Sequence, residues 1–441
     1  MTFRSVSILC FFLVGLFGFS QSRFVIENKH RSCNIKFKLI NNLVVIPVEV
    51  NGVELSFLLD TGVSKPIIFN FLNVSDTLNI KETETIFLRG LGASKMVEAL
   101  KSKNNIFKIG EAIKLNQDLY AVFNANLDLS PRLGIPIHGI IGFDLFRDLV
   151  VQINYSTQRL KLTEPEAYKM KDCRKCETFN LEFYNGKPYI NVKVEIDAKE
   201  IPIKLLIDSG GSDALWLFEN EDLGIHSSDK YFYDFLGYGL NGSVYGKRSK
   251  VDKFFLKSFE LKKANVAYPD SSSVIFAKQI RNRNGSLSGN ILKRFDVVFN
   301  YQKARLTLKK NKYFRLPFNY NKSGIELAHD GVRLVKEEKG KVLNPKESYQ
   351  NNTRIIIDTR YKIALKPAYG IVELRENSPA EQCGLQKGDI VISVNGKQTH
   401  QFSLQEIMQM FHDEAGKKMR LRVERNGRTL NFSFELADFL D

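Results

Sequence analysis

Two short acidic motifs are the residues of this 441-residue sequence best suited to chemistry. They are Asp60-Thr61-Gly62 and Asp208-Ser209-Gly210, and each follows a run of apolar residues. Two carboxylates held about 3 Å apart cannot both ionise, so one keeps a proton while the other acts as a base. Such a pair can activate water and polarise a carbonyl group. One Asp-Thr-Gly alone is a common turn, and it is the matched second copy that predicts this chemistry.

The elements that must position the two aspartates are repeated along the chain. Each copy has two strand-like segments of alternating polarity joined by a turn, 44–50 and 53–59 before Asp60, and 189–196 and 201–207 before Asp208. A second block follows each motif at nearly the same distance. It contains Ile140-Ile141-Gly142 in the first copy and Leu287-Ser288-Gly289 in the second. Because two separated blocks keep their register, the sequence predicts a duplicated, mostly β lobe.

The residues beside the two aspartates fit a shared carboxylate site. Gly62 and Gly210 allow a tight turn that points each carboxylate inward. Thr61 and Ser209 are expected to hydrogen-bond across the interface between the lobes and to fix the pair. The pair would then lie on a pseudo-twofold axis that relates the two lobes.

These motifs resemble those of the retropepsin-like and pepsin-like aspartic peptidases, through segments 57–62 and 204–210 and the two later Gly-containing elements. The resemblance covers about residues 33–312. It implies two closed β-barrel lobes, at 33–170 and 171–312, and endopeptidase activity on a polypeptide substrate without cofactor or metal. It also implies that Asp60 and Asp208 are catalytic, supported by Thr61, Gly62, Ser209 and Gly210.

The resemblance further implies a glycine-bearing flap over the substrate. One candidate is segment 88–92, with Gly90 and Gly92, and its counterpart is segment 237–242, with Gly237 and Gly239. Both can equally be ordinary hairpin tips. No Tyr lies between Pro66 and Leu119, which makes the first lobe more similar to the short retroviral type than to pepsin.

The sequence departs from the pepsin-like pattern beside each aspartate. Val63 and Gly211 stand where pepsin-like enzymes carry a hydroxyl residue that hydrogen-bonds the carboxylate. The loss of that hydrogen bond should raise the apparent pKa values of the pair. We therefore expect a pH optimum less acidic than that of pepsin. Ser288 also stands where an apolar residue is expected.

The pattern changes after Pro317. Segments 370–374 and 377–396 strongly resemble the PDZ domains of bacterial envelope proteases, which predicts an α+β PDZ domain at 317–438. Segment 404–411 reads as an amphipathic helix beside a peptide groove. The expected carboxylate-binding loop is Gly324, Ile325, Glu326 and Leu327, with Glu326 where a second Gly is usual. The groove can bind a C-terminal peptide ligand, or the domain can be a structural cap on the protease.

The N-terminus has the pattern of a secretory signal peptide at residues 1–20, with Arg4 before an apolar run from Val6 to Phe19. The run is too short for a bilayer span, so we expect an exported protein, periplasmic or extracellular, with no membrane span after signal removal. For Cys173 and Cys176 the sequence favours a structural disulfide or free thiols over a metal site, because no neighbouring His or Cys completes a ligand set.

A net charge of +15 raises the question of a nucleic-acid partner. The basic residues are scattered, without a compact or aromatic-interleaved patch, so we predict no nucleic-acid binding. Two further interpretations remain beside the enzyme. One is an exported, catalytically inactive protein that binds peptides. The other, a thiol redox protein using Cys173 and Cys176, lacks the expected βαβ pattern.

Overall fold

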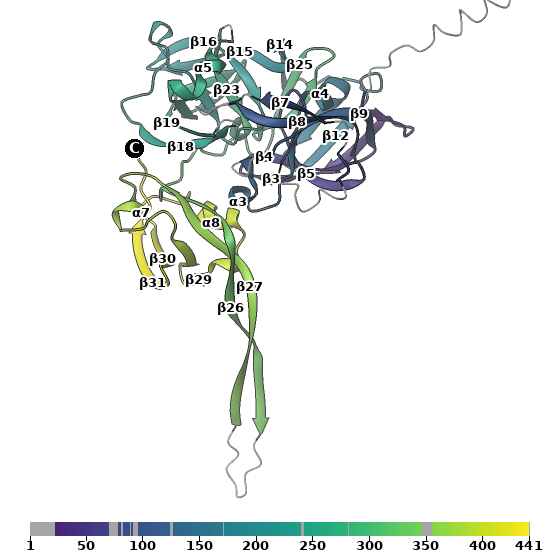
Figure 1. Ribbon diagram of the computed structural model, residues 1–441. Helices are drawn as coiled ribbons and strands as arrows, with labels where there is room; N and C mark the ends of the chain where they lie inside the picture. The colour runs from purple at the N-terminus through teal and green to yellow at the C-terminus, as the bar shows by residue number, and fades with distance from the viewer. Residues whose placement is uncertain are drawn as a thin grey trace, which may run out of the picture.

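The computed structural model describes residues 23–69, 78–80, 83–88, 90, 96–123, 127–170, 172–239, 242–280, 282–345 and 355–440. The predicted signal peptide lies outside these residues. The fold is mostly β, as the sequence predicts. Two sheet-rich halves form the upper body in Figure 1, and a smaller module with a long hairpin lies below them. Among the described residues, no helix has the length and apolar character needed to span a membrane.

The first half is built around one mixed sheet, in the order β1-β9-β6-β10-β5-β4-β8-β7, with β3 paired to β4. Its strands are β1 (Val25–Ile26), β3 (Lys38–Ile40), β4 (Leu43–Val50), β5 (Val53–Leu59), β6 (Ile67–Ile68), β7 (Thr83–Leu88), β8 (Val97–Ile109), β9 (Ala112–Ala121) and β10 (Gly139–Ile141). Two short helices accompany the sheet, α3 (Ser130–Leu133) and α4 (Phe143–Asp148).

The second half repeats this plan, in the order β18-β19-β22-β17-β23-β16-β15-β20-β21, with β14 paired to β15. Its strands are β14 (Glu182–Tyr184), β15 (Lys187–Ile196), β16 (Lys199–Asp208), β17 (Leu215–Leu217), β18 (Phe232–Gly239), β19 (Gly242–Lys250), β20 (Lys253–Leu256), β21 (Phe259–Lys262), β22 (Asn265–Pro269) and β23 (Arg283–Ser288). Its short helices are η3 (Glu221–Leu223), α5 (Ser271–Lys278) and α6 (Gly289–Leu292).

The expected closed barrels are not confirmed. In the first half the sheet curls until β8 pairs with both β9 and β4, but β4 and β8 pair only at Glu49 and Val50, so the ring is not a true barrel. In the second half, β18 and β21 lie at the two ends of the sheet and, among the described residues, do not pair with each other. The sequence motifs specify the hairpins, whereas closure depends on how strongly each sheet coils, which the motifs do not encode.

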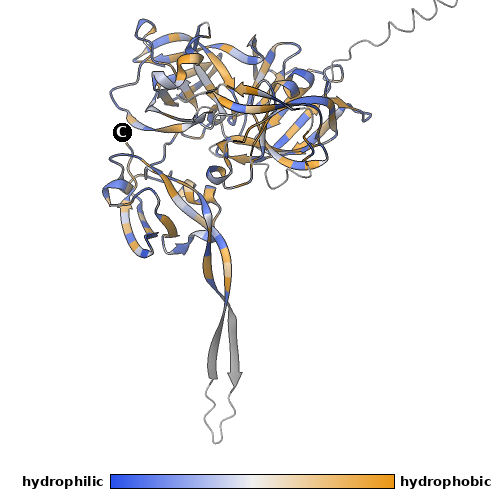
Figure 2. Ribbon diagram, viewed as in Figure 1, coloured by the Kyte–Doolittle hydropathy of each residue, from blue (hydrophilic) through white to orange (hydrophobic). Residues whose placement is uncertain are grey.

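A third sheet joins the halves, in the order β13-β25-β24-β11-β12-β2. Its strands are β2 (Ser32–Lys36), β11 (Val150–Asn154), β12 (Arg159–Thr163), β13 (Cys176–Asn180), β24 (Phe295–Asn300) and β25 (Arg305–Lys310). The strands β11 and β24, which follow the second repeated block of each half, pair with each other at its centre. One apolar core runs through both halves, and along the strands apolar and polar residues alternate (Figure 2).

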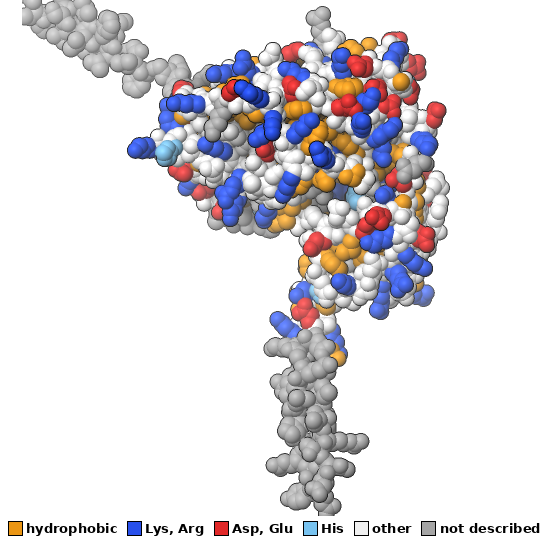
Figure 3. All heavy atoms as spheres, turned by 180° about the vertical axis from the view of Figure 1, so that it is seen from behind, with side chains coloured by type: hydrophobic (Ala, Val, Ile, Leu, Met, Phe, Trp, Pro, Cys, Tyr) orange, Lys and Arg blue, Asp and Glu red, His pale blue; other side chains and the backbone are white. Residues whose placement is uncertain are grey.

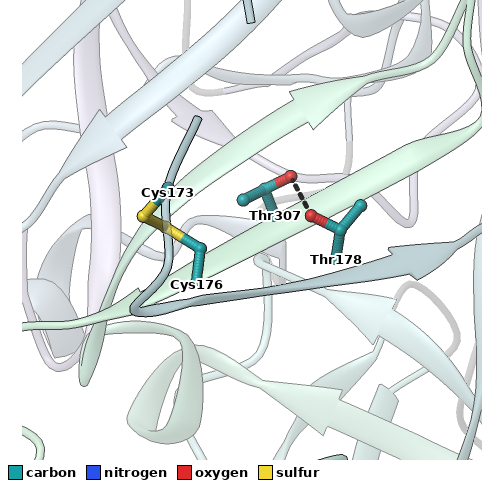
Figure 4. Close-up of a disulfide and its surroundings, with 4 residues drawn as sticks. All are labelled: Cys173, Cys176, Thr178 and Thr307. Atoms are coloured by element: carbon teal, nitrogen blue, oxygen red, sulfur yellow. Dashed lines mark hydrogen bonds between the residues drawn. A yellow bond between two sulfur atoms is a disulfide. The ribbon is translucent and has the colours of Figure 1, made fainter. Parts of the chain in front are cut away.

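A disulfide between Cys173 and Cys176 closes the turn that leads into β13 (Figure 4). This agrees with one of the two non-metal expectations for the pair. Nearby, the hydroxyls of Thr178 and Thr307 lie 3.0 Å apart across β13 and β25. Lysine and arginine side chains are spread over the face shown in Figure 3 and are not gathered in one patch.

The C-terminal module has its own apolar core and a sheet in the order β26-β27-β28-β30-β31, with β29 paired to β28. Its strands are β26 (Ile325–Pro345), β27 (Ile355–Leu374), β28 (Ile390–Val394), β29 (Lys397–Gln398), β30 (Lys418–Arg425) and β31 (Arg428–Glu435), and its helices are α7 (Pro379–Gln382), η4 (Thr399–Gln401) and α8 (Leu404–Met410). The outer parts of β26 and β27 form an arm that projects away from the body (Figure 1).

Candidate active site

Each Asp motif follows a strand whose neighbour is parallel to it. In the first half, β5 pairs with the parallel strand β10, and the amide of Asp60 donates to the Ile141 carbonyl at 2.9 Å. In the second half, β16 pairs with the parallel strand β23, where Asp208 is opposite Ser288. The repeated blocks of the sequence are therefore neighbours in space, and each holds the end of the strand that carries an aspartate.

The two motifs meet across the interface between the halves. The Thr61 amide donates to Ser209 Oγ at 3.0 Å, and the Ser209 amide donates to Thr61 Oγ1 at 3.1 Å. Each hydroxyl also donates to a carbonyl of the opposite strand, Thr61 Oγ1 to Ile207 at 2.6 Å and Ser209 Oγ to Leu59 at 2.8 Å. Both side chains are buried. This reciprocal network is the contact that the sequence predicts for these two residues.

The network brings the carboxyl groups of Asp60 and Asp208 together. The Gly62 amide donates to Asp60 Oδ1 at 2.6 Å, and the Gly210 amide donates to Asp208 Oδ1 at 3.1 Å. The Asp60 carboxyl group lies against the Cα of Gly210, so closely that a Cβ at that position would overlap it. A Cβ on Gly62 would lie 3.6 Å from Asp208 Oδ1. Gly210 is thus required by a close approach between the two motifs.

The surroundings of the pair favour retention of a proton. Burial, and then the negative charge of Asp208, raise the pKa of Asp60 to about 7. Burial also raises the pKa of Asp208, against the opposing effects of Arg283 and Lys187. Lys187 opposes the rise in the pKa of Asp60 as well, whereas Arg283 acts on Asp208, so the two carboxyl groups have unequal surroundings. Both carboxyl groups therefore hold a proton more readily than an exposed aspartate does.

Sequence reasoning missed the groups around the pair. Lys187 begins β15, directly after the Asn185-Gly186 turn, and burial lowers its pKa while both aspartates oppose that effect. Arg283 begins β23, and its guanidinium lies 5.3 Å from the centroid of the Phe218 ring. Neither residue belongs to a recognisable motif. The one signal in the sequence is positional. Lys187 is the first residue of the first strand in the second repeat, directly after a turn.

Ser288 and Gly211 form a second feature that the sequence did not reveal. The position of a Cβ on Gly211 would lie 2.8 Å from Ser288 Oγ and 3.4 Å from Asp208 Oδ2. The Ser288 hydroxyl therefore fills the space where a side chain at position 211 would stand beside the carboxylate. Ser288 stands where the resemblance predicts an apolar residue. Its hydroxyl lies next to Gly211, which stands where the resemblance predicts a hydroxyl residue.

The predicted flap residues are only partly described. Gly92 lies outside the described residues, and Gly90 follows the end of β7. Gly237 and Gly239 belong to the β18–β19 hairpin, whose register shifts between Phe235 and Gly237. The closure of both candidate segments over a substrate stays a prediction.

The predicted carboxylate-binding loop uses its amides internally. The Gly324 amide donates to Asn321 Oδ1 at 3.2 Å, and the Ile325 amide donates to Ser323 Oγ at 3.0 Å. Glu326 and Leu327 continue into β26, where Glu326 pairs with Glu373. Burial, and then the charge of Asp234, raise the pKa of Glu326 to about 7. The binding role of this loop stays a prediction.

Among the described residues, no group of three or more His, Cys, Asp or Glu side chains is arranged to hold a metal ion. The arrangement is that of two carboxylates and their hydrogen-bond donors, which can act on water directly. Residues 46–145 match a family model described as aspartyl protease, and residues 370–425 match one described as PDZ domain. The chain carries an aspartyl protease domain and a PDZ domain.

The aspartyl protease match contains Asp60 and Gly142 and ends before Asp208. The likeness of the second half to the first therefore rests on the sequence repeat and on the parallel strand pairs. The PDZ match begins at Gly370, within β27, and ends at Arg425, the last residue of β30. It contains α8, the helix expected beside a peptide groove.

Proposed function

We propose that this chain is an exported aspartic endopeptidase of the two-lobed type, retropepsin-like or pepsin-like, in which Asp60 and Asp208 form the catalytic pair. The lobes correspond to residues 33–170 and 171–312, and the PDZ domain corresponds to residues 317–438. The observation that carries the proposal is the reciprocal Thr61–Ser209 network, which brings the carboxyl groups of Asp60 and Asp208 close together. The matching aspartyl protease domain supports it.

The electrostatics of the pair support the following steps of peptide hydrolysis. Asp208, ionised beside Arg283 and Lys187, takes a proton from water as the oxygen attacks the scissile carbonyl carbon. Asp60 gives its proton to the carbonyl oxygen, which forms a tetrahedral gem-diol. As the carbon–nitrogen bond breaks, the proton on Asp208 passes to the leaving nitrogen and one gem-diol proton returns to Asp60. The pair is then in its starting state, with no covalent enzyme intermediate.

The remaining parts of the chain are assigned to substrate handling. The hairpins that contain Gly90 and Gly237 act as flaps over an extended polypeptide. The PDZ domain docks a peptide or regulates cleavage. The predicted signal peptide directs the protein to the periplasm or the exterior.

The experiment that tests the proposal is cleavage of unfolded casein between pH 3 and pH 8, which spans carboxylate and histidine titration. Wild-type protein is compared with Asp60→Asn and Asp208→Asn, which keep the size of each side chain. Loss of cleavage in both variants, with urea unfolding midpoints close to wild type, is expected. Absence of wild-type cleavage at every pH, with casein still bound, would favour the catalytically inactive peptide-binding protein.

A further inference from the structure

The PDZ domain brings a sheet edge and a helix side by side, the arrangement that forms the peptide groove of such domains. Strand β26 is the edge of the C-terminal sheet, and α8 packs beside it. A free sheet edge of this kind can bind an extended polypeptide by strand addition, with side-chain pockets that give specificity. What binds in this groove therefore decides what the domain does.

A segment of the first protease lobe already lies there. This latch segment, Leu129–Gly134, consists of α3 with its two caps, and α3 packs against β26. On the helix side of the groove, Gln405 of α8 donates to the Leu133 carbonyl. On the strand side, His329 of β26 hydrogen-bonds the Gly134 backbone. The segment thus contacts both walls.

Gly134 fits this position because it has no side chain. Its φ of 67° is in the left-handed region, and a Cβ on it would lie 2.9 Å from Leu404 Cβ at the start of α8. The contact between the lobe and the helix is therefore closer than any other residue would allow. Such close packing indicates that the segment binds at one specific position.

Arg132 connects the latch segment to two other elements. Its guanidinium donates to Glu373 of β27 at 3.1 Å and to the Tyr238 hydroxyl of the β18–β19 hairpin at 3.2 Å. It also lies over the rings of Phe235 and Tyr238, at 4.7 Å and 4.6 Å from their centroids. The side chains of Arg132 and Glu373 are 21% and 14% exposed, so solvent screens this ion pair only in part. One side chain joins the first lobe, the PDZ domain and the hairpin of the second lobe.

We propose that the latch segment is an internal ligand of the PDZ groove, and that an external extended polypeptide must displace it to bind. Displacement removes Arg132 from Tyr238 and Phe235, which loosens the β18–β19 hairpin although its Asp234 keeps the ion pair with Arg375 of the PDZ domain. The binding part of this inference is independent of catalysis. Its consequence for cleavage rests on the proposed function, because the loosened hairpin is one of the two assigned flaps.

The test measures binding of a fluorescent peptide that copies residues 127–136 to the full chain. All proteins carry Asp208→Asn, so that the peptide is not cleaved and a failure of the proposed catalysis leaves the readout intact. Gly134→Ala and Arg132→Ala loosen the resident segment, and neither replaces a residue of β26 or α8. Gly427→Ala is the matched control, because Gly427 has a similar φ of 73° but open space around it.

We expect Gly134→Ala and Arg132→Ala to bind the peptide about tenfold more tightly than the parent and Gly427→Ala, because the competing occupant is weakened. Peptide binding should also speed hydrogen exchange in Phe232–Gly239, the β18 side of the hairpin. Equal affinity in all four proteins, or no binding to any, would overturn the internal ligand. Tight binding with unchanged exchange in β18 would overturn the link to the hairpin.

Discussion

The surroundings of the two aspartates differ at the residue scale. Arg283 and Lys187 both favour the ionised form of Asp208, and of these two cations Lys187 also favours the ionised form of Asp60. The asymmetry of the pair thus comes from residues that differ between the two repeats. A duplicated site acquires an acid and a base through its unequal surroundings.

Lys187 should set the acidic limit of activity. In Lys187→Met the pKa values of both aspartates should rise, because a favourable positive charge is removed while burial remains. We expect the acidic limb of the kcat/KM profile for casein cleavage to move to higher pH. Lys193→Met is the control, because Lys193 lies on the same strand and pairs with Glu200 at 2.9 Å, where both side chains are exposed. An unchanged acidic limb in Lys187→Met would contradict this role.

Ser288 should compensate for the missing hydroxyl at position 211. Ser288→Ala removes the hydroxyl that fills the space beside Gly211 and the Asp208 carboxyl group, so the pair should be held less firmly and kcat/KM should fall by about tenfold. Gly211→Ser in the Ser288→Ala background should restore part of the activity, because the serine hydroxyl then stands in the vacated space. Wild-type activity in Ser288→Ala would show that its hydroxyl has no part in the site.

At the scale of elements, the interlocked strand ends β5 and β16 hold the site. Thr61→Val keeps the shape of the side chain but leaves the Ser209 amide and the Ile207 carbonyl without their buried partner. An unsatisfied buried group costs about 1–3 kcal/mol, so we expect a loss of about 2–5 kcal/mol in the free energy of unfolding by urea. Thr178→Val, which removes a hydroxyl pair on the joining sheet, should cost less. An equal loss in the free energy of unfolding for Thr61→Val and Thr178→Val would mean that the Thr61 network stabilises the fold no more than a hydroxyl pair elsewhere does.

The sequence predicted these elements because their signals are local. A few consecutive residues are enough to indicate an alternating strand, a hairpin turn or an Asp motif. The repeat then predicts that Asp60 and Asp208 meet. Closed barrels were not predicted correctly, because coiling depends on the packing of whole sheets. Lys187, Arg283 and the seat of Gly134 could not be predicted, because each depends on contacts between residues that are distant in sequence.

At the scale of the whole molecule, buried acids make stability depend on pH. The pKa values of Asp60, in the site, and Glu326, where the PDZ domain faces Asp234, are both raised to about 7. The folded chain therefore binds more protons than the unfolded chain between about pH 4 and pH 7. Because of this difference, the stabilising contribution of these two groups is full below about pH 4 and is lost as pH rises toward 7.

We expect urea unfolding midpoints to fall for the wild type between pH 4 and pH 7 as these groups ionise. Asp60→Asn and Glu326→Gln should each remove part of that decrease, because an amide has no proton to lose. Asp197→Asn, at an exposed turn, is the control and should behave as the wild type. Equal slopes in all four proteins would contradict the raised pKa values.

The most direct test of the central claim is the titration of Asp60 itself, by NMR of protein labelled with carbon-13 at the aspartate carboxyl carbons. Asp60→Asn identifies the signal by its absence. We expect a pKa of about 7 in the wild type and a lower value in Asp208→Asn, where the neighbouring charge is gone but burial remains. An ordinary aspartate pKa near 3.9 in the wild type, or no decrease in Asp208→Asn, would show that the two carboxyl groups do not share a proton.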